Sequence, residues 1–242
     1  MNTLVATDIS GIFLDDSVEL SVVLPVFNEV AIVGRMHERL QAVLQPLGIR
    51  HELLFVDDGS QDGSTETLLR MAQEDPLVKA VILEGHAGKE AALAAGLSRA
   101  AGRAVIIMDA DLQDPPERIP DMVMAWRAGA DVVRMCRTPA AGVSVFGAGM
   151  IRSVHRILGG VIDAAGGARN TDFLLYSRKA VTALSLIVGR KRYMAPMFAW
   201  MGLRETAIEY QRQPRLTGSR GRHLAAWLQG RSPRQSRWQC TL

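Results

Sequence analysis

Two aspartates, Asp109 and Asp111, stand one residue apart after the apolar run of residues 104–108. In an extended chain, residues i and i+2 point to the same side. The pair can therefore offer carboxylate oxygens to one hard divalent cation such as Mg²⁺ or Mn²⁺, with the oxygen of Gln113 nearby. Asp-x-Asp recurs by chance, but here a wholly apolar strand precedes it and the helix start at residues 115–117 follows it. These neighbours place the carboxylates at the end of a central strand, where open α/β sheets bind ligands.

Polar side chains also follow the apolar runs 20–26 and 51–56. Glu29, after the first run, can accept hydrogen bonds from ribose hydroxyls. Asp57, after the second, can accept them from the imide or amine of a nucleobase. The carboxyl ends of adjacent strands thus deliver a second group of acceptors beside the aspartate pair.

Other polar residues have simpler interpretations. For Asp62 and Ser64 we favour turn and helix-cap roles. Residues 85–90 follow an apolar run and open a helix, so Lys89 and backbone N–H groups can face a phosphate there. The spacing of a phosphate-binding loop and a complete dinucleotide fingerprint are both missing, so neither a P-loop enzyme nor a nicotinamide enzyme is expected.

The composition is that of an ordinary soluble globular protein: 242 residues, 48% hydrophobic and 22% charged, with a net charge of +3. From Arg212 to the end, the chain has seven arginines and no acidic residue. Such a tail suits anionic phosphates, anionic lipid or nucleic acid equally well, and it can also be a solvated, partly disordered end.

The cysteines and the apolar segments bear on the compartment. Cys136 and Cys240 lack the paired spacing of a zinc or redox motif, which indicates a reduced, cytoplasmic protein. Residues 1–17 carry aspartates and no Lys or Arg, unlike a secretory signal. No segment has the roughly 18 consecutive apolar residues that a membrane span needs, so contact with a membrane is expected only at its surface.

Apolar, β-branched runs alternate with helical patterns between residues 19 and 134, which predicts a parallel sheet with crossover helices. Strands are expected at residues 20–26, 51–56, 77–83, 104–108 and 130–135. Helices are expected between them, one after residue 29 and the others at residues 64–73, 87–101 and 117–127. A loop near residue 138 is expected to precede a helix at 146–158, a strand at 172–176, a helix at 178–187 and a strand at 204–210.

Residues 25–29, 57–63, 88–97 and 109–117 have the order and form of the family-two glycosyltransferases. More narrowly, they resemble the polyprenyl-phosphate glycosyltransferases, which include dolichol-phosphate mannose synthase and bacterial enzymes that load sugars onto undecaprenyl phosphate. The resemblance implies an α/β, GT-A (Rossmann-like) fold with a mixed, mainly parallel sheet flanked by helices. We expect an N-terminal extension (1–18), a GT-A domain (19–218) and a basic, atypical tail (219–242).

The resemblance also implies the chemistry: an inverting, metal-dependent transfer from a UDP- or GDP-sugar to a polyprenyl phosphate. It assigns nucleotide binding to Pro25, Asn28, Glu29, Asp57, Asp58, Lys89, Asp109 and Ala110, with Asp57 reading the base. It assigns Mg²⁺ or Mn²⁺ to Asp109, Asp111 and Gln113, catalysis to Asp172 and Asp111, and phosphate binding to Arg137, Arg212 and Arg215. The acceptor phosphate is already anionic, so a general base is not strictly required.

Simpler roles stay open for some of these residues. Asp172 can be a base, an orienting group, an arginine's partner or only a strand-edge aspartate. Arg137, Arg212 and Arg215 can be phosphate ligands, for which the forked guanidinium is well suited, or plain surface charges.

The chain departs from the family pattern on the acceptor side. Residues 140–144 replace a loop that usually carries a second arginine and a Gly-Glu-Ser-like turn, and Leu174 stands where the family has an arginine. The Gly-x-Ser-Lys element is reduced to residues 218–220, and the two membrane-spanning helices of the bacterial branch are not found. Residues 224–242 resemble nothing in the family, and a truncated or frame-shifted end would look like this.

Three functions follow. The first is sugar transfer to polyprenyl phosphate at the cytoplasmic face of the inner membrane, on the membrane surface or with a membrane partner. The second keeps the donor chemistry and uses a soluble acceptor. The third is a degenerate, non-catalytic module for nucleotide binding or assembly. No nucleic-acid partner is expected.

Overall fold

The computed structural model describes residues 3–5, 18–137, 172–185 and 201–211. Within these ranges the chain forms one eight-stranded sheet in the order β1-β4-β3-β2-β5-β7-β6-β8. The strands are β1 Thr3–Val5, β2 Leu20–Val26, β3 His51–Asp57, β4 Val78–Ile82, β5 Ala104–Ile107, β6 Val132–Arg137, β7 Leu174–Ser177 and β8 Glu205–Tyr210. β7 runs antiparallel to both of its neighbours, whereas all other pairs are parallel. The expected mixed, mainly parallel α/β sheet is confirmed.

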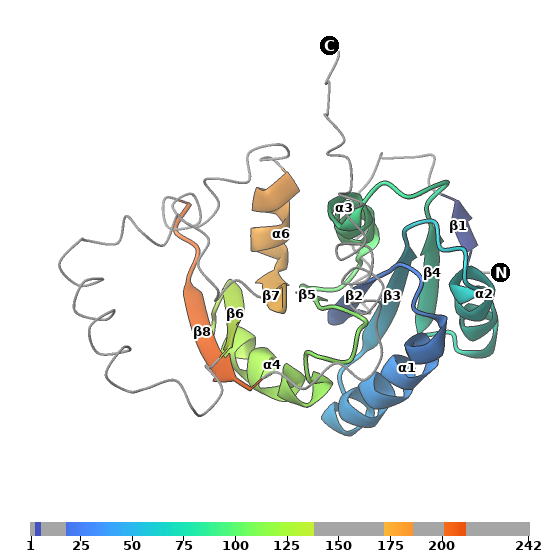
Figure 1. The fold of residues 1–242 in the computed structure, drawn as a ribbon. Helices are drawn as coiled ribbons and strands as arrows, with labels where there is room; N and C mark the ends of the chain where they lie inside the picture. Colours follow the sequence, from blue (N-terminus) through green and yellow to red (C-terminus); the bar gives the residue numbers. More distant parts are fainter. Residues whose placement is uncertain (1–2, 6–17, 138–171, 186–200, 212–242) are drawn as a thin grey trace, which may run out of the picture.

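Helices cover both faces of the sheet (Figure 1). On one face lie α1 Val30–Leu44, α2 Ser64–Glu74 and α4 Ile119–Arg127, and on the other lie α3 Lys89–Arg99 and α6 Arg178–Ser185. Two short 3₁₀ turns, η1 Gln45–Leu47 and η2 Pro116–Arg118, complete the described elements. Because both faces are covered, every residue of β3 is buried, which explains why its residues 53–56 are consecutive apolar side chains and do not alternate with polar ones.

The expected elements agree with the observed ones to within a few residues. The strand predicted at residues 20–26 matches β2 at both ends. The helix predicted at residues 87–101 is the shorter α3, Lys89–Arg99, and the strand predicted at residues 104–108 ends at Ile107. The predicted helix at 146–158 lies outside the described residues. The order β5-β7-β6 was not foreseen, and it inserts a late segment of the chain beside the strand that carries the aspartate pair.

The segments that the structure describes include no helix with both the length and the apolar character needed to cross a bilayer.

α3 lies unusually close to the sheet at Gly96. A Cβ atom there would overlap Cγ1 of Val23 and lie 3.1 Å from Cγ2 of Val56. We expect Gly96→Ala to lower the free energy of unfolding by about 1–3 kcal/mol, because β-branched neighbours in a packed core have no room to yield. Urea unfolding of the purified protein measures this change.

Gly34, in the middle of α1, provides a matched control because a Cβ there would meet no atom within 4 Å. Gly34→Ala is expected to stabilise the protein by up to about 1 kcal/mol through helix propensity. Equal shifts in the two variants would contradict a steric origin for the Gly96 effect.

Candidate functional site

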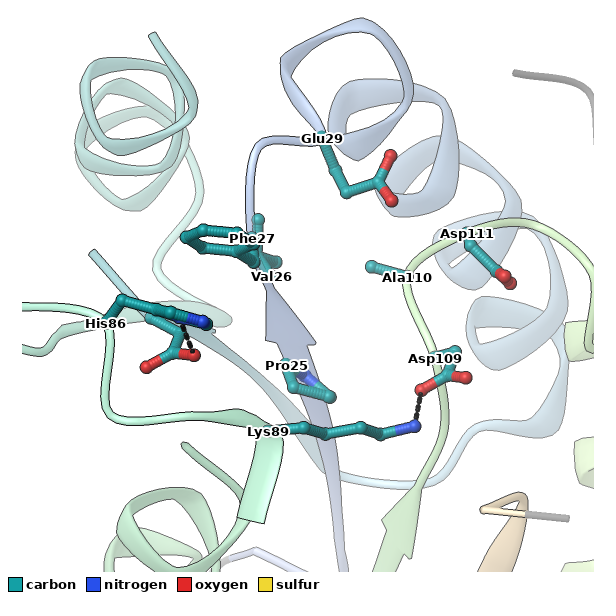
Figure 2. Close-up of a pocket in the computed structure, with 10 residues that line it drawn as sticks. Pro25, Val26, Phe27, Glu29, His86, Lys89, Asp109, Ala110 and Asp111 are labelled. Carbon is teal, nitrogen blue, oxygen red and sulfur yellow. Dashed lines mark hydrogen bonds and ion pairs between the residues drawn. The ribbon is translucent and has the colours of Figure 1, made fainter. Parts of the chain in front are cut away.

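A pocket opens at the carboxyl ends of β2, β3 and β5, beside the start of α3 (Figure 2). Each side of it is built by a loop that follows one of these strands or that precedes the helix. The lining residues are Pro25, Val26, Phe27, Glu29, Asp58, His86, Lys89, Asp109, Ala110 and Asp111. Loops far apart in sequence are thus brought together at the edge of the sheet where the sequence predicted a site.

The aspartate pair lines this pocket, although the local geometry differs from the predicted one. β5 ends at Ile107, and Leu112 has a positive φ of 61°, so Asp109 and Asp111 belong to a turning loop and not to an extended strand. The side chain of Asp109 is 24% exposed, whereas Asp111 is nearly buried at 9%. Gln113 is not among the lining residues, and its backbone N–H donates to Oδ1 of Asp111 at 3.0 Å.

The loop after β3 places two adjacent aspartates differently. β3 extends one residue further than expected, to Asp57, whose fully buried carboxylate accepts hydrogen bonds from the Ser60 N–H at 3.1 Å and from the Thr65 hydroxyl. Asp58 follows and lines the pocket. In this structure Asp57 therefore organises its own loop, while Asp58 stands where the base-reading carboxylate was expected.

Asp58 in turn fixes the loop before α3. Its carboxylate accepts hydrogen bonds from Nδ1 of His86 at 2.7 Å, from the Ala87 N–H at 2.7 Å, and from the Gly88 N–H at 3.0 and 3.1 Å. Gly59 allows this approach: its φ is +72°, and a Cβ there would lie 2.7 Å from the backbone of Gly85. The loop after β3 and the loop before α3 are thereby held together, and both contribute residues to the pocket wall.

Asn28 and its partners join the loop after β2 to the loop after β3. Asn28 has a φ of 54°, which asparagine tolerates better than most residues, and its Oδ1 accepts from the Gln61 N–H at 2.8 Å. It does not line the pocket, unlike its neighbours Pro25 and Glu29. Asp62 accepts from the Val30 N–H at 3.1 Å, and the Ser64 hydroxyl accepts from the Glu29 N–H at 3.0 Å, so both residues make structural bonds between the two loops, while α2 begins after Gly63 without a side-chain cap.

Phe27 and His86 form a stacked pair on the wall opposite Asp109 and Asp111 (Figure 2). Their ring centroids lie 4.1 Å apart at an angle of 18°, and Phe27 is 41% exposed. This pair was missed in the sequence. An aromatic residue at the end of a strand was the available signal, but its partner comes from another loop. The exposed aromatic surface offers a flat apolar face to a planar ring.

Lys89 links the pocket to Asp172. Its Nζ lies 2.5 Å from Oδ1 of Asp109 and 2.6 Å from Oδ2 of Asp172. Burial alone would lower the pKa of Lys89, but the two carboxylates outweigh it and raise the pKa. The structure therefore brings Asp172, which precedes β7, to the edge of the site, and its catalytic role stays a prediction.

Arg137, the last residue of β6, belongs to a neighbouring cluster. Its Nε donates to the hydroxyl of Tyr210 at 3.4 Å, and that hydroxyl donates to Oδ1 of Asp114, which is fully buried. Burial alone would lower the pKa of Arg137, but Tyr210 together with the charges of Asp114 and Asp109 raises it. Burial and the bond to Asp114 raise the pKa of Tyr210. The predicted phosphate-binding Arg212 and Arg215 lie outside the described residues.

The donor set suits a hard divalent cation. Asp109 and Asp111 line one pocket, and an ammonium group already lies against Asp109, so the site attracts positive charge. Among the described residues there is no group of three or more His, Cys, Asp or Glu side chains that could hold a metal. Two carboxylates alone match Mg²⁺ or Mn²⁺ chemistry, in which oxygens of water and of a bound phosphate complete the coordination.

Comparison with known proteins shows which family the chain resembles. Residues 21–183 match the model of the family described as glycosyl transferase family 2. An uncharacterized glycosyltransferase of Synechocystis sp. is 38% identical over 202 residues, which cover 84% of this chain and 64% of that protein. A bactoprenol glucosyl transferase of Shigella phage SfV is 32% identical over 200 residues, which cover 83% of this chain and 65% of that protein. The chain thus spans less than two thirds of the length of these relatives.

Solved structures share the fold. The mannosyltransferase PcManGT from Pyrobaculum calidifontis, in complex with GDP-Man and Mn²⁺, superposes with a TM-score of 0.60 at 21% identity, covering 91% of this chain and 62% of that one. Glucosyl-3-phosphoglycerate synthase from Mycobacterium tuberculosis, in complex with Mg²⁺ and UDP, gives 0.53 at 21% identity, covering 89% and 80%. At these identities the likeness shows the fold alone, and the expected GT-A architecture is confirmed.

Proposed function

Because the chain belongs to glycosyl transferase family 2, we propose that it transfers a sugar from a nucleotide-diphosphate sugar to a polyprenyl phosphate. The observation that carries this proposal is the convergence of the four family-like loops on one pocket that contains Asp58, Asp109 and Asp111. The relatives named bactoprenol glucosyl transferase support the choice of acceptor. Such a lipid acceptor would bring the reaction to the cytoplasmic face of the inner membrane.

The donor would be held by the pocket walls. Phe27 and His86 offer a face for the base, and Glu29 can accept hydrogen bonds from ribose hydroxyls. Asp109 and Asp111 would hold Mg²⁺ or Mn²⁺, which neutralises charge on the departing nucleoside diphosphate. Lys89 adds a positive charge on the same side of the pocket.

The acceptor would be held by a different group of residues from those that hold the donor. Its phosphate oxygen forms the new bond to the anomeric carbon as the bond between that carbon and the diphosphate oxygen breaks, which inverts the configuration. Arg137 would orient that phosphate, because it ends β6 at the same edge of the sheet as the aspartate pair and its forked guanidinium suits phosphate oxygens. The acceptor oxygen is already anionic, so Asp172 serves as an orienting group and need not remove a proton.

The direct test is a screen of radiolabelled UDP- and GDP-sugars with undecaprenyl phosphate and Mn²⁺. Label that moves into the organic phase supports the proposal. Label that is transferred but stays in water would favour a soluble acceptor instead. Calorimetry that detects no nucleotide-sugar binding in the presence of Mn²⁺ would overturn the proposed donor chemistry.

Asp58 provides a test of the donor pocket alone. Asp58→Asn cannot accept from His86 and from the Ala87 and Gly88 N–H groups as the carboxylate does, so the loop that carries His86 should loosen. We expect the dissociation constant of the nucleoside diphosphate to rise about tenfold, which corresponds to about 1.4 kcal/mol. Calorimetry with UDP and with GDP measures the change.

Asp75→Asn is the matched control, because Asp75 also pairs with a histidine, His37, at 2.8 Å but lies outside the pocket lining. Its nucleotide affinity should equal that of the wild-type protein. An unchanged affinity in Asp58→Asn would show that the Asp58 loop does not shape the nucleotide site.

A further inference from the structure

Lys89 makes contacts that a simple phosphate-binding lysine does not need. It is the first residue of α3, where the positive end of the helix dipole disfavours a cation. Its ammonium is held there by two carboxylates from other parts of the fold, Asp109 after β5 and Asp172 before β7, at 2.5 and 2.6 Å. The three groups join segments up to 83 positions apart in the sequence.

The position of Lys89 conflicts with binding of a divalent cation at the same carboxylate. Oδ1 of Asp109 contacts the ammonium directly, so a cation that binds Asp109 must displace Lys89 or suffer its repulsion. Displacement is feasible because the lysine side chain is 39% exposed and rotates about several bonds. Asp172, at 58% exposure, loses its link to Asp109 when Lys89 moves.

We propose that Lys89 is an exchangeable internal cation, which balances Asp109 and Asp172 until a divalent cation binds and which then turns to the diphosphate of the donor. Lys89 thus couples occupation of the metal site to the release of Asp172. The inference rests on the proposed function for the identity of the diphosphate. Its metal-exchange part depends only on the carboxylates and on Lys89.

The Lys89 ammonium lies between the carboxylates of Asp109 and Asp172, so it places a positive charge directly beside the metal ligands. A charged group beside the metal ligands lowers the affinity for the free metal ion. The same group raises the affinity for an anionic ligand that arrives together with the metal. Loss of the charge should therefore change the two affinities in opposite directions.

The test is calorimetric titration of the full chain with Mn²⁺ alone, and then with UDP or GDP at saturating Mn²⁺. For Lys89→Met we expect Mn²⁺ alone to bind about tenfold more tightly than to the wild-type protein, a coupling of ordinary size between two sites. The nucleoside diphosphate should bind about tenfold more weakly to the same variant. Lys89→Arg keeps the charge, so its affinities for Mn²⁺ alone and for the nucleoside diphosphate should be close to those of the wild-type protein.

Lys179→Met is the matched control, since it removes the same charge from a lysine that pairs with Asp131 at 3.6 Å and lies outside the pocket lining. It should leave both affinities unchanged. If Lys89 only held the carboxylates in place, Lys89→Met and its less apolar counterpart Lys89→Gln would bind Mn²⁺ more weakly, and this result would overturn the inference. Absence of Mn²⁺ binding in both the wild-type and Lys89→Met proteins would also overturn it, whereas the transfer assay tests the proposed function separately.

Discussion

Replacing Asp111 with asparagine is expected to lower kcat/KM for sugar transfer about 10³-fold, since loss of one preorganised electrostatic contact in an active site typically costs 10²–10³. Asp111 is nearly buried and lines the pocket together with Asp109. The amide keeps the shape of the side chain but removes the negative charge that a divalent cation requires. The measurement is transfer of radiolabelled sugar to undecaprenyl phosphate under saturating Mn²⁺.

A second readout separates loss of the metal site from loss of the fold. Asp111→Asn should also weaken Mn²⁺ binding in calorimetry, while its thermal unfolding stays close to that of the wild-type protein. Asp121→Asn is the control, because Asp121 lies on α4 and pairs with Arg118 at 3.0 Å, outside the pocket lining. Transfer by Asp111→Asn at the wild-type rate would remove Asp111 from the proposed machinery.

Replacing Arg137 with alanine is expected to lower kcat/KM for the lipid acceptor about 10–100-fold, the range expected for a lost charge-assisted hydrogen bond to phosphate. The dissociation constant of the nucleotide donor should not change, because Arg137 does not line the pocket. The variant therefore separates the acceptor half of the reaction from the donor half. Initial rates with varied undecaprenyl phosphate, and calorimetry with the donor nucleotide, measure the two effects.

Arg134→Ala is the matched control for this experiment. Arg134 lies on the same strand, has the same 28% side-chain exposure as Arg137, and pairs with Glu205. Arg137 also neutralises the buried Asp114, so Arg137→Lys is included to keep that charge while removing the guanidinium fork. If Arg134→Ala and Arg137→Ala impair lipid transfer equally, Arg137 has no special role toward the acceptor.

The sequence predicted well what depends on local physics. Residues 22–26 of β2 and 53–56 of β3 are consecutive apolar side chains, as expected for strands covered on both faces, and such runs have few alternatives to a buried strand. Since parallel strands deliver their carboxyl ends to one edge, Glu29, Asp109 and Asp111 could be placed in one pocket from their positions alone. The division of the chain into an extension, a domain and a tail stays a prediction.

Which of the predicted site residues line the pocket depends on the exact ends of elements, and the predicted roles of the others stay predictions. β3 is one residue longer than expected, so Asp57 ends the strand and bonds within its own loop, whereas Asp58 follows the strand and lines the pocket. Leu112 has a positive φ, and Gln113 after it contacts Asp111 through its backbone N–H and does not line the pocket. Asn28 faces a neighbouring loop for a similar reason, since its backbone is left-handed.

The amino-acid sequence by itself determined the fold class, the edge of the sheet that carries the site and the residue types that gather there. The tertiary structure decided which side chains touch: Lys89 with Asp109 and Asp172, and Phe27 with His86. Hydrophobic periodicity and strand direction are local properties that can be read along the chain. Contacts between loops depend on the antiparallel insertion of β7 and on the register of distant strands, so only the folded chain brings Lys89 against both Asp109 and Asp172.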